Sequence, residues 1–276
     1  MFPKIVLLGD SITQLSFSAT LSGFGAHLAD VYQRRADVLN RGFSGYNTDW
    51  IIEYLSTSIG QEHIFGASEN DRNSVRLMTI FFGANDASDK VLNERHHVPL
   101  ERYKKNLESI HSMAKKSCPN AKFIILSPPP VHHKSRLKYQ VDRYKEKATG
   151  KLERTLELSG SYANAAKEVA EHLNVPFLNV WQKMQDASND WGTFLSDGLH
   201  LSKEGNLFVG ENIVSLIQTN YPDLIVAPCP FTNHYGNSSS KCAALENFAP
   251  FHDEIDHKDP KDAFCNENSR KKQKGK

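Results

Sequence analysis

The sequence predicts an α/β protein in which helices cover both faces of a parallel sheet of about five strands. Three observations lead to this fold class. Short apolar runs alternate with longer segments in which apolar residues recur at helical spacing. The first run, residues 5–8, is uninterrupted, which is typical of a strand buried on both faces. Polar stretches follow four of the runs, where a parallel sheet gathers its functional groups.

The expected elements follow in order along the chain. Strands are expected at residues 4–8, 37–40, 75–82, 122–127 and 175–180. Helical spacing is found over residues 24–35, 50–55, 100–116, 140–173 and 207–217, with a break at Gly150. Three prolines, residues 128–130, end the fourth strand, because proline continues neither a ladder nor a helix. We expect a polar, irregular surface insertion at residues 60–74, solvated side chains for His132 and His133, and a loop at residues 191–202.

Composition restricts the class of partner and the location. The chain of 276 residues can form one α/β domain, and 33 basic residues against 32 acidic ones favour neither a nucleic-acid nor a membrane partner. No apolar run is long enough to span a membrane, and the first residues lack the pattern of a secretory signal. The four cysteines match no disulfide framework and no zinc motif. We therefore expect a cytoplasmic protein with free thiols.

The pattern of strands and helices ends near Pro228. Residues 229–276 are rich in Asn, Ser, Asp and Lys, with a basic end over residues 270–276. Low apolar content predicts that this extension is partly disordered or lies on the surface of a domain formed by residues 1–228. A solvated tail is favoured over a binding segment, and a homodimer is compatible with a domain of this size.

The turn after the first strand carries the first candidate for chemistry. Gly9 allows a sharp turn, and Asp10 and Ser11 stand where a helix begins. A hydroxyl held there by a rigid strand faces the positive end of a helix dipole, so Ser11 is a candidate nucleophile. The alternative is that Asp10-Ser11 only caps the helix.

A serine nucleophile needs a base, a group that orients the base, and donors for the oxyanion. Asp197 and His200 are three residues apart, so Asp197 can accept from Nδ1 of His200 and leave Nε2 to deprotonate Ser11. Gly45 can present a backbone N–H and Asn85 a side-chain amide as oxyanion donors. Each residue also has a structural alternative: helix caps for Asp197 and Asn85, a packed polar residue for His200, and a turn for Gly45. The chain has no Gly-x-Ser-x-Gly elbow, which argues against an α/β-hydrolase.

Four blocks together resemble a known family. Gly9-Asp10-Ser11-Ile12, the loop around Gly45, Gly83-Ala84-Asn85-Asp86 and Asp197-Gly198-Leu199-His200 occur in the order of the motif blocks of the GDSL or SGNH hydrolases. The amino-acid sequence at residues 41–46, 80–87 and 197–202 is similar to that of the isoamyl acetate-hydrolysing esterase branch of this family. The likeness covers residues 4–228, and Ile12 stands where the family name has Leu.

The resemblance implies a fold, a site and a reaction. The fold is a flavodoxin-like three-layer sandwich. The implied triad is Ser11, His200 and Asp197, and the implied oxyanion hole combines the N–H groups of Ser11 and Gly45 with the Asn85 amide. The reaction is a two-step acyl transfer that needs neither metal nor cofactor.

The expected substrate is a short-chain ester, such as an acetate of a small alcohol. Apolar residues flank the motifs and are candidates for an apolar rim, although each is also a candidate for the core. They are Phe82, Pro128, Pro129, Trp191, Leu199 and Leu201. Alternatives are a carbohydrate O-deacetylase or a lysophospholipase with the same triad, or a non-catalytic scaffold that acts through its tail.

Overall fold

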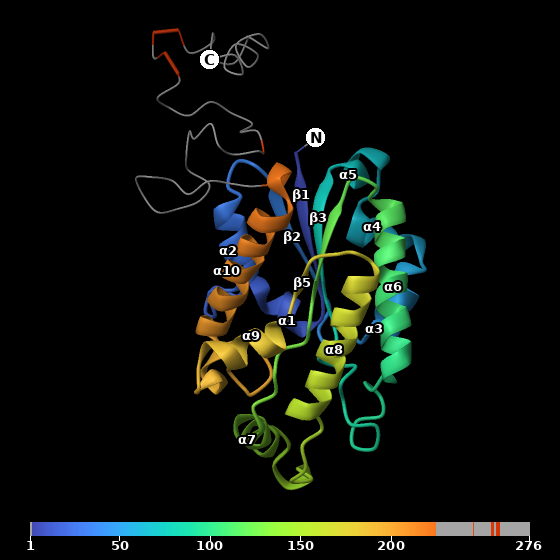
Figure 1. Cartoon of the computed structure of the whole chain (residues 1–276), viewed down its shortest axis with the longest axis vertical. Helices are drawn as coiled ribbons and strands as arrows, with labels where there is room; N and C mark the ends of the chain where they lie inside the picture. Colours follow the sequence, from blue (N-terminus) through green and yellow to red (C-terminus); the bar gives the residue numbers. More distant parts are fainter. Residues whose placement is uncertain (1, 225–244, 246–254, 257, 260–276) are drawn as a thin grey trace.

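The protein is a three-layer α/β sandwich around one five-stranded parallel sheet, as a computed structural model shows (Figure 1). The structure describes residues 2–224, 245, 255–256 and 258–259. The strands are β1 (Lys4–Gly9), β2 (Asp37–Gly42), β3 (Val75–Phe81), β4 (Lys122–Leu126) and β5 (Phe177–Leu178), and they lie in the order β2-β1-β3-β4-β5. All four neighbouring pairs are parallel. The predicted fold class is confirmed.

Strand β1 contributes side chains to the hydrophobic clusters on both faces of the sheet. Ile5, Val6, Leu7 and Leu8 have no exposed surface, as the uninterrupted apolar run predicts. Successive side chains of a strand point to opposite faces of the sheet. Ile5 and Leu7 therefore belong to the cluster on one face, the first core, and Val6 and Leu8 belong to the cluster on the other face, the second core. The sheet order changes direction at β1, because β2 pairs on one side and β3 on the other. Such a switch point opens a crevice at the carboxyl ends of the strands.

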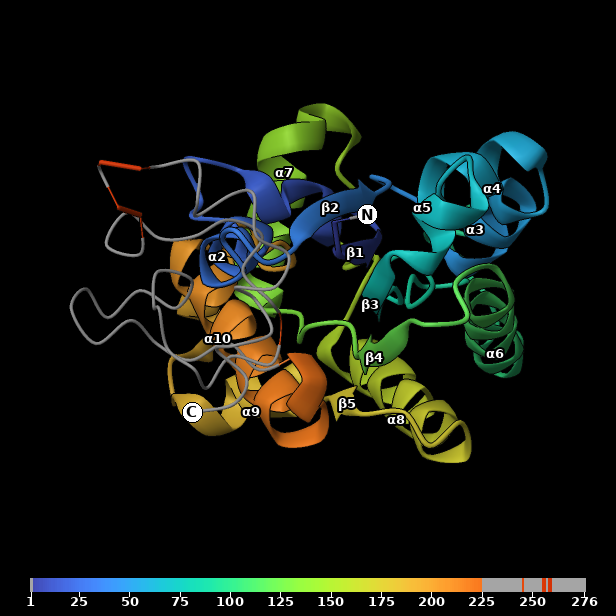
Figure 2. The same ribbon diagram turned by 90° about the horizontal axis from the view of Figure 1, so that it is seen from above.

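Helices cover the two faces as separate groups. On one face lie α2 (Phe24–Val31), α9 (Val180–Ala187) and α10 (Lys203–Asn220), and on the other α3 (Thr48–Leu55), α4 (Ser58–Phe65), α6 (Leu100–Ser117) and α8 (Leu156–His172) (Figure 2). The remaining helices are α1 (Ser11–Gln14), α5 (Glu69–Asn73), α7 (His133–Tyr144) and the 3-10 turns at Leu15–Phe17, Lys145–Lys147, Trp191–Phe194 and Pro222–Leu224. None of the helices in the described ranges is long and apolar enough to cross a membrane.

The expectation of an irregular insertion at residues 60–74 is wrong. Helices α4 and α5 occupy most of this segment, and Ile64 and Phe65 are buried in the second core. Thr57 caps α4, and Ser68 caps α5 in a capping box with Asp71. The buried apolar side chains of α4 lie in its last turn, and α5 has none. This is too short a stretch for a helical periodicity to be visible in the sequence.

The last part of the predicted pattern, from residue 133 onward, needs four smaller corrections. The helical segment at residues 140–173 is two helices, α7 and α8, and the break runs from Lys145 to Thr155 rather than lying at Gly150 alone. The fifth strand is only Phe177–Leu178. His133 is not simply solvated, since its Nε2 accepts a hydrogen bond of 2.8 Å from the backbone N–H of Leu156. The predicted loop at residues 191–202 begins with a 3-10 turn.

Nearly all of the predicted C-terminal extension, residues 229–276, lies outside the described residues. One described residue there is Leu245, which is buried against the first core and accepts a hydrogen bond from Arg35 through its carbonyl. The domain boundary at residue 228 stays a prediction.

Candidate active site

Ser11 lies at the first residue of α1, directly beyond the carboxyl end of β1. Asp10 caps the helix, because its Oδ1 accepts a hydrogen bond of 2.9 Å from the N–H of Ile12. A Cβ atom at Gly9 would lie 2.6 Å from the carbonyl oxygen of Phe81, so the turn requires glycine there. Helix α1 has only four residues, so its dipole contributes little, and the local N–H groups are the main source of positive potential.

His200 and Asp197 form a hydrogen-bonded chain with Ser11. The Oγ of Ser11 lies 2.9 Å from Nε2 of His200, and Nδ1 of His200 lies 2.8 Å from Oδ2 of Asp197. A carboxylate only accepts, so Nδ1 carries the proton and Nε2 of the neutral ring accepts from Ser11. The structure thus brings together three side chains that are up to 189 positions apart in the sequence.

The loop that carries Asp197 and His200 is tightly turned. Oδ1 of Asp197 accepts from the N–H groups of Leu199 and His200, at 3.0 and 2.7 Å. Gly198 has a φ of +82°, and a Cβ atom there would lie 2.4 Å from the backbone nitrogen of Arg136. The cap of α10 is Ser202, so Asp197 is not the cap of the following helix.

Charge holds Asp197 ionised. Burial by itself raises its pKa, but the hydrogen bonds from the side chain and backbone of His200 and the charge of Arg136 outweigh burial and hold the pKa well below its usual range. Arg136 donates from Nη1 to Oδ2 of Asp197 at 3.2 Å, and the side chain of Asp197 is 13% exposed. The carboxylate can therefore stabilise an imidazolium on His200.

Two further loops end beside Ser11. The loop after β2 contains Gly45, whose φ of +81° favours glycine. The loop after β3 contains Asn85, which is 5% exposed and whose Nδ2 donates to the carbonyl of Tyr46 at 2.9 Å. Because Gly9 pairs with Gly42 and with Phe81, the carboxyl ends of these three strands lie side by side. Gly45 and Asn85 thus lie at the same edge of the sheet as Ser11.

Several polar groups around the site were missed by sequence reasoning. Arg136, Glu153 and Arg154 lie next to the triad and the Asn85 loop, and His96 approaches Gly45, with Nε2 3.9 Å from the position of a Cβ there. In the sequence these residues belong to charged runs that resemble exposed helix faces and loops. No spacing in the sequence indicates that two arginines are buried.

Two carboxyl groups near the nucleophile, those of Asp10 and Asp86, are buried. Burial raises the pKa of Asp10 to about 6 and that of Asp86 to about 7. Oδ1 of Asp86 accepts from the N–H and hydroxyl of Thr48, at 2.9 and 2.5 Å. Within the described residues, Oδ2 of each carboxyl has no hydrogen-bond partner, which suits a protonated form.

The residues expected to form an apolar rim are mostly core residues. Phe82, Leu199 and Leu201 are at most 4% exposed, Pro128 and Pro129 are buried, and Trp191 is half-buried against His132. Phe82, Leu199 and Leu201 belong to the hydrophobic clusters on the two faces of the sheet. Their burial agrees with the alternative that each is a core residue, and a part in binding the substrate stays a prediction.

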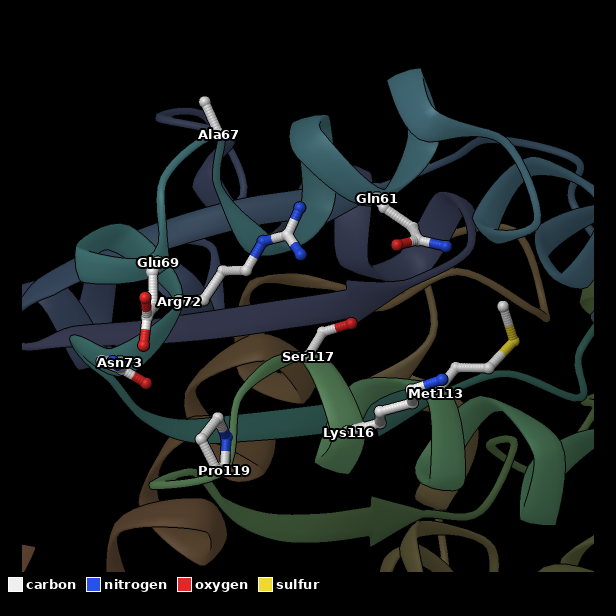
Figure 3. Close-up of a pocket in the computed structure, with 9 residues that line it drawn as sticks. All are labelled: Gln61, Ala67, Glu69, Arg72, Asn73, Met113, Lys116, Ser117 and Pro119. Carbon is white, nitrogen blue, oxygen red and sulfur yellow. The ribbon is translucent and has the colours of Figure 1, made fainter.

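A hollow of about 570 Å³ lies away from this site, among segments that precede β3 and β4 (Figure 3). It is lined by Gln61, Arg72, Met113 and Lys116, among others. Strands β3 and β4 begin there, so the hollow is at the end of the sheet opposite to Ser11. No group of three or more His, Cys, Asp or Glu residues in the described part of the chain could hold a metal ion.

Comparisons with known proteins bear on the family and the fold of the chain. The model of the GDSL-like Lipase/Acylhydrolase family matches residues 7–207. A GDSL esterase/lipase of Arabidopsis thaliana is 43% identical over 220 residues, which cover 78% of this chain and 86% of the relative. The human isoamyl acetate-hydrolyzing esterase 1 homolog is 39% identical over 228 residues, with coverage of 81% and 85%. The crystal structure of a lipase/acylhydrolase from Enterococcus faecalis superposes with a TM-score of 0.57 at 24% identity, covering 79% of this chain and 96% of that one, and it supports the fold.

Proposed function

The chain belongs to the GDSL-like lipase/acylhydrolase family and is a carboxylic ester hydrolase, and from this premise we propose that Ser11, His200 and Asp197 are its catalytic triad. The observation that carries the proposal is the continuous chain of short contacts, 2.9 Å from Ser11 to His200 and 2.8 Å from His200 to Asp197. A base within hydrogen-bond reach of a hydroxyl, itself oriented by a carboxylate, is the arrangement that activates serine.

The reaction proceeds by two acyl transfers. Ser11 Oγ attacks the ester carbonyl while its proton passes to Nε2 of His200, and Asp197 stabilises the imidazolium that forms. The proton then moves to the oxygen of the departing alcohol, which leaves an acyl group on Ser11. Water then attacks the acyl group while His200 takes its proton, and His200 returns this proton to Ser11 Oγ as the carboxylic acid leaves.

The oxyanion of each tetrahedral intermediate binds the N–H groups of Ser11 and Gly45 and the Nδ2 of Asn85. Their positions at the ends of three adjacent strands support this assignment. Donors held rigidly at the developing charge lower the barrier because they need no reorganisation during the reaction.

The substrate class in this proposal is a short-chain ester, with acetates of small aliphatic alcohols such as isoamyl acetate as first candidates. The support is the name of the human relative, an isoamyl acetate-hydrolyzing esterase 1 homolog, which is 39% identical. A cytoplasmic location belongs to the same proposal.

A substrate panel tests the proposal. Purified wild-type protein and Ser11→Ala are assayed on isoamyl acetate, an acetylated xylooligosaccharide and a lysophospholipid, with a buffer sample as the blank. The proposal expects the highest kcat/KM on isoamyl acetate and no activity above the blank in Ser11→Ala. A higher kcat/KM on the acetylated sugar or the lysophospholipid would assign that substrate class instead, and activity that survives in Ser11→Ala would refute the triad.

A further inference from the structure

Arg154 is a buried arginine that contacts the loop carrying Asn85. It lies in the segment between α7 and α8 and is 5% exposed. Its Nε donates to the carbonyl of Ala84 at 2.7 Å, and its Nη2 donates to Oδ1 of Asn85 at 3.0 Å. One planar guanidinium therefore holds both the backbone and the side chain of the loop after β3.

The two partners of the Asn85 amide determine which way it faces. A guanidinium has no acceptor, so the atom of Asn85 that faces Arg154 must be the oxygen. The carbonyl of Tyr46 has no proton, so the atom that faces it, at 2.9 Å, must be the nitrogen. An amide turned by 180° would lose both bonds and present oxygen to the oxyanion. The second N–H of Nδ2 remains available for a substrate.

The charge of Arg154 also strengthens Asn85 as a donor. A hydrogen bond from a cation to Oδ1 favours the resonance form with positive charge on Nδ2, because hydrogen bonds in a chain polarise one another. Glu153 neutralises the buried charge through Oε1, which lies 2.6 Å from Nη1 of Arg154 and 2.7 Å from Nη2 of Arg136. Arg136 in turn contacts Asp197, so hydrogen bonds connect the Asn85 amide to the triad.

We propose that Arg154 is a positioning residue of the oxyanion hole, which holds and polarises the Asn85 amide so that Nδ2 faces the substrate. The inference rests on the proposed function, since it assigns Asn85 to the oxyanion. It makes Arg154 act on the reaction through Asn85, without touching the ester itself.

A double-mutant cycle on kcat separates this role from a purely structural one. Asn85→Ala should lower kcat about 10²- to 10³-fold, as expected for one oxyanion donor. Arg154→Met should lower kcat about 10- to 100-fold with little change in KM, since a misplaced donor loses part of that contribution. In the Asn85→Ala background, Arg154→Met should lower kcat by less than about 3-fold, because the group it positions is absent. Arg143→Met, at an exposed arginine that contacts Tyr139, is the matched control and should leave kcat unchanged.

The outcomes are distinct. An equal loss of kcat in both backgrounds, or wild-type kcat in folded Arg154→Met, would overturn the proposal. If Arg154→Met does not fold, Arg154→Lys replaces it in the cycle, since lysine keeps the charge but cannot contact Ala84, Asn85 and Glu153 at once. Failure of both variants to fold would assign Arg154 to stability alone and also overturn the proposal.

Wild-type protein and Ser11→Ala are assayed alongside, so that a failure of the proposed function is distinguished from a failure of the role proposed for Arg154. Absence of ester hydrolysis in the wild type would refute the proposed function. Hydrolysis that depends on Ser11, combined with additive losses in the cycle, would refute only the role of Arg154.

Discussion

Replacement of Asp197 by asparagine changes one atom in the triad and has a calculable consequence. Oδ1 can keep its bonds to the N–H groups of Leu199 and His200, so the loop should retain its shape. The new NH2 group then faces Nδ1 of His200 and Nη1 of Arg136, both of which donate to Oδ2 in the native protein. The imidazole can avoid two opposed donors only by moving its proton to Nε2. In that tautomer His200 cannot accept the proton of Ser11.

The expected loss in kcat is about 10³- to 10⁴-fold, which corresponds to about 4–5.5 kcal/mol in the activation free energy. KM should change little, because Asp197 does not contact the ester. The assay is steady-state hydrolysis of p-nitrophenyl acetate, with the melting temperature measured on the same samples. Asp186→Asn on the exposed face of α9 is the control, because it makes the same change of carboxylate to amide at a residue that, within the described part of the chain, accepts only from Gln182. If folded Asp197→Asn kept kcat within about tenfold of the wild type, the assignment of Asp197 as the group that orients His200 would be refuted.

The sequence predicted those features that depend on local pattern and on sheet topology. The uninterrupted apolar run of β1 indicates a strand buried on both faces, and this strand lies inside the sheet, between β2 and β3. Parallel strands place their carboxyl ends along one edge, so the loops with Ser11, Gly45 and Asn85 were expected to meet there. The spacing of Asp197 and His200 predicted their contact, which is local in the chain.

The missed features depend on tertiary contacts that no local pattern reveals. Arg136 and Arg154 are buried only because Glu153 and the carbonyl of Ala84 compensate their charges and donors. Helices α4 and α5 are stabilised by their caps and by packing of one turn, rather than by an extended amphipathic stripe. The sequence left core and rim open for the apolar residues beside the motifs, because an apolar residue there belongs to the core as readily as to a pocket.

Two further variants test the account. Gly198→Ala should lower the free energy of unfolding by about 2 kcal/mol or more, because it combines a left-handed φ with a clash against the backbone of Arg136, and it should lower kcat by displacing His200. The control Gly150→Ala has a similar φ of +70° but open space around the Cβ position, so a loss equal to that of Gly198→Ala in chemical denaturation would contradict the role of the clash. Asp86 has a raised pKa, so its contribution to stability is complete below its unfolded pKa of 3.8 and is lost as the pH rises through about 7. Asp86→Asn should therefore show a smaller fall in the free energy of unfolding between these pH values than the wild type. The same pH dependence in both proteins would contradict the raised pKa of Asp86.

Covalent labelling of the nucleophile tests the central claim most directly. An activated p-nitrophenyl phosphonate should add one phosphonyl group to the wild-type chain, and peptide mapping by mass spectrometry should place it on Ser11. Ser11→Ala should carry no adduct and lose at least about 10⁴-fold in kcat on an acetate ester, whereas Ser44→Ala, at an exposed serine near Gly45, should retain both adduct and activity. An adduct on another residue, or substantial ester hydrolysis by Ser11→Ala, would contradict the claim that the Ser11 hydroxyl performs the reaction.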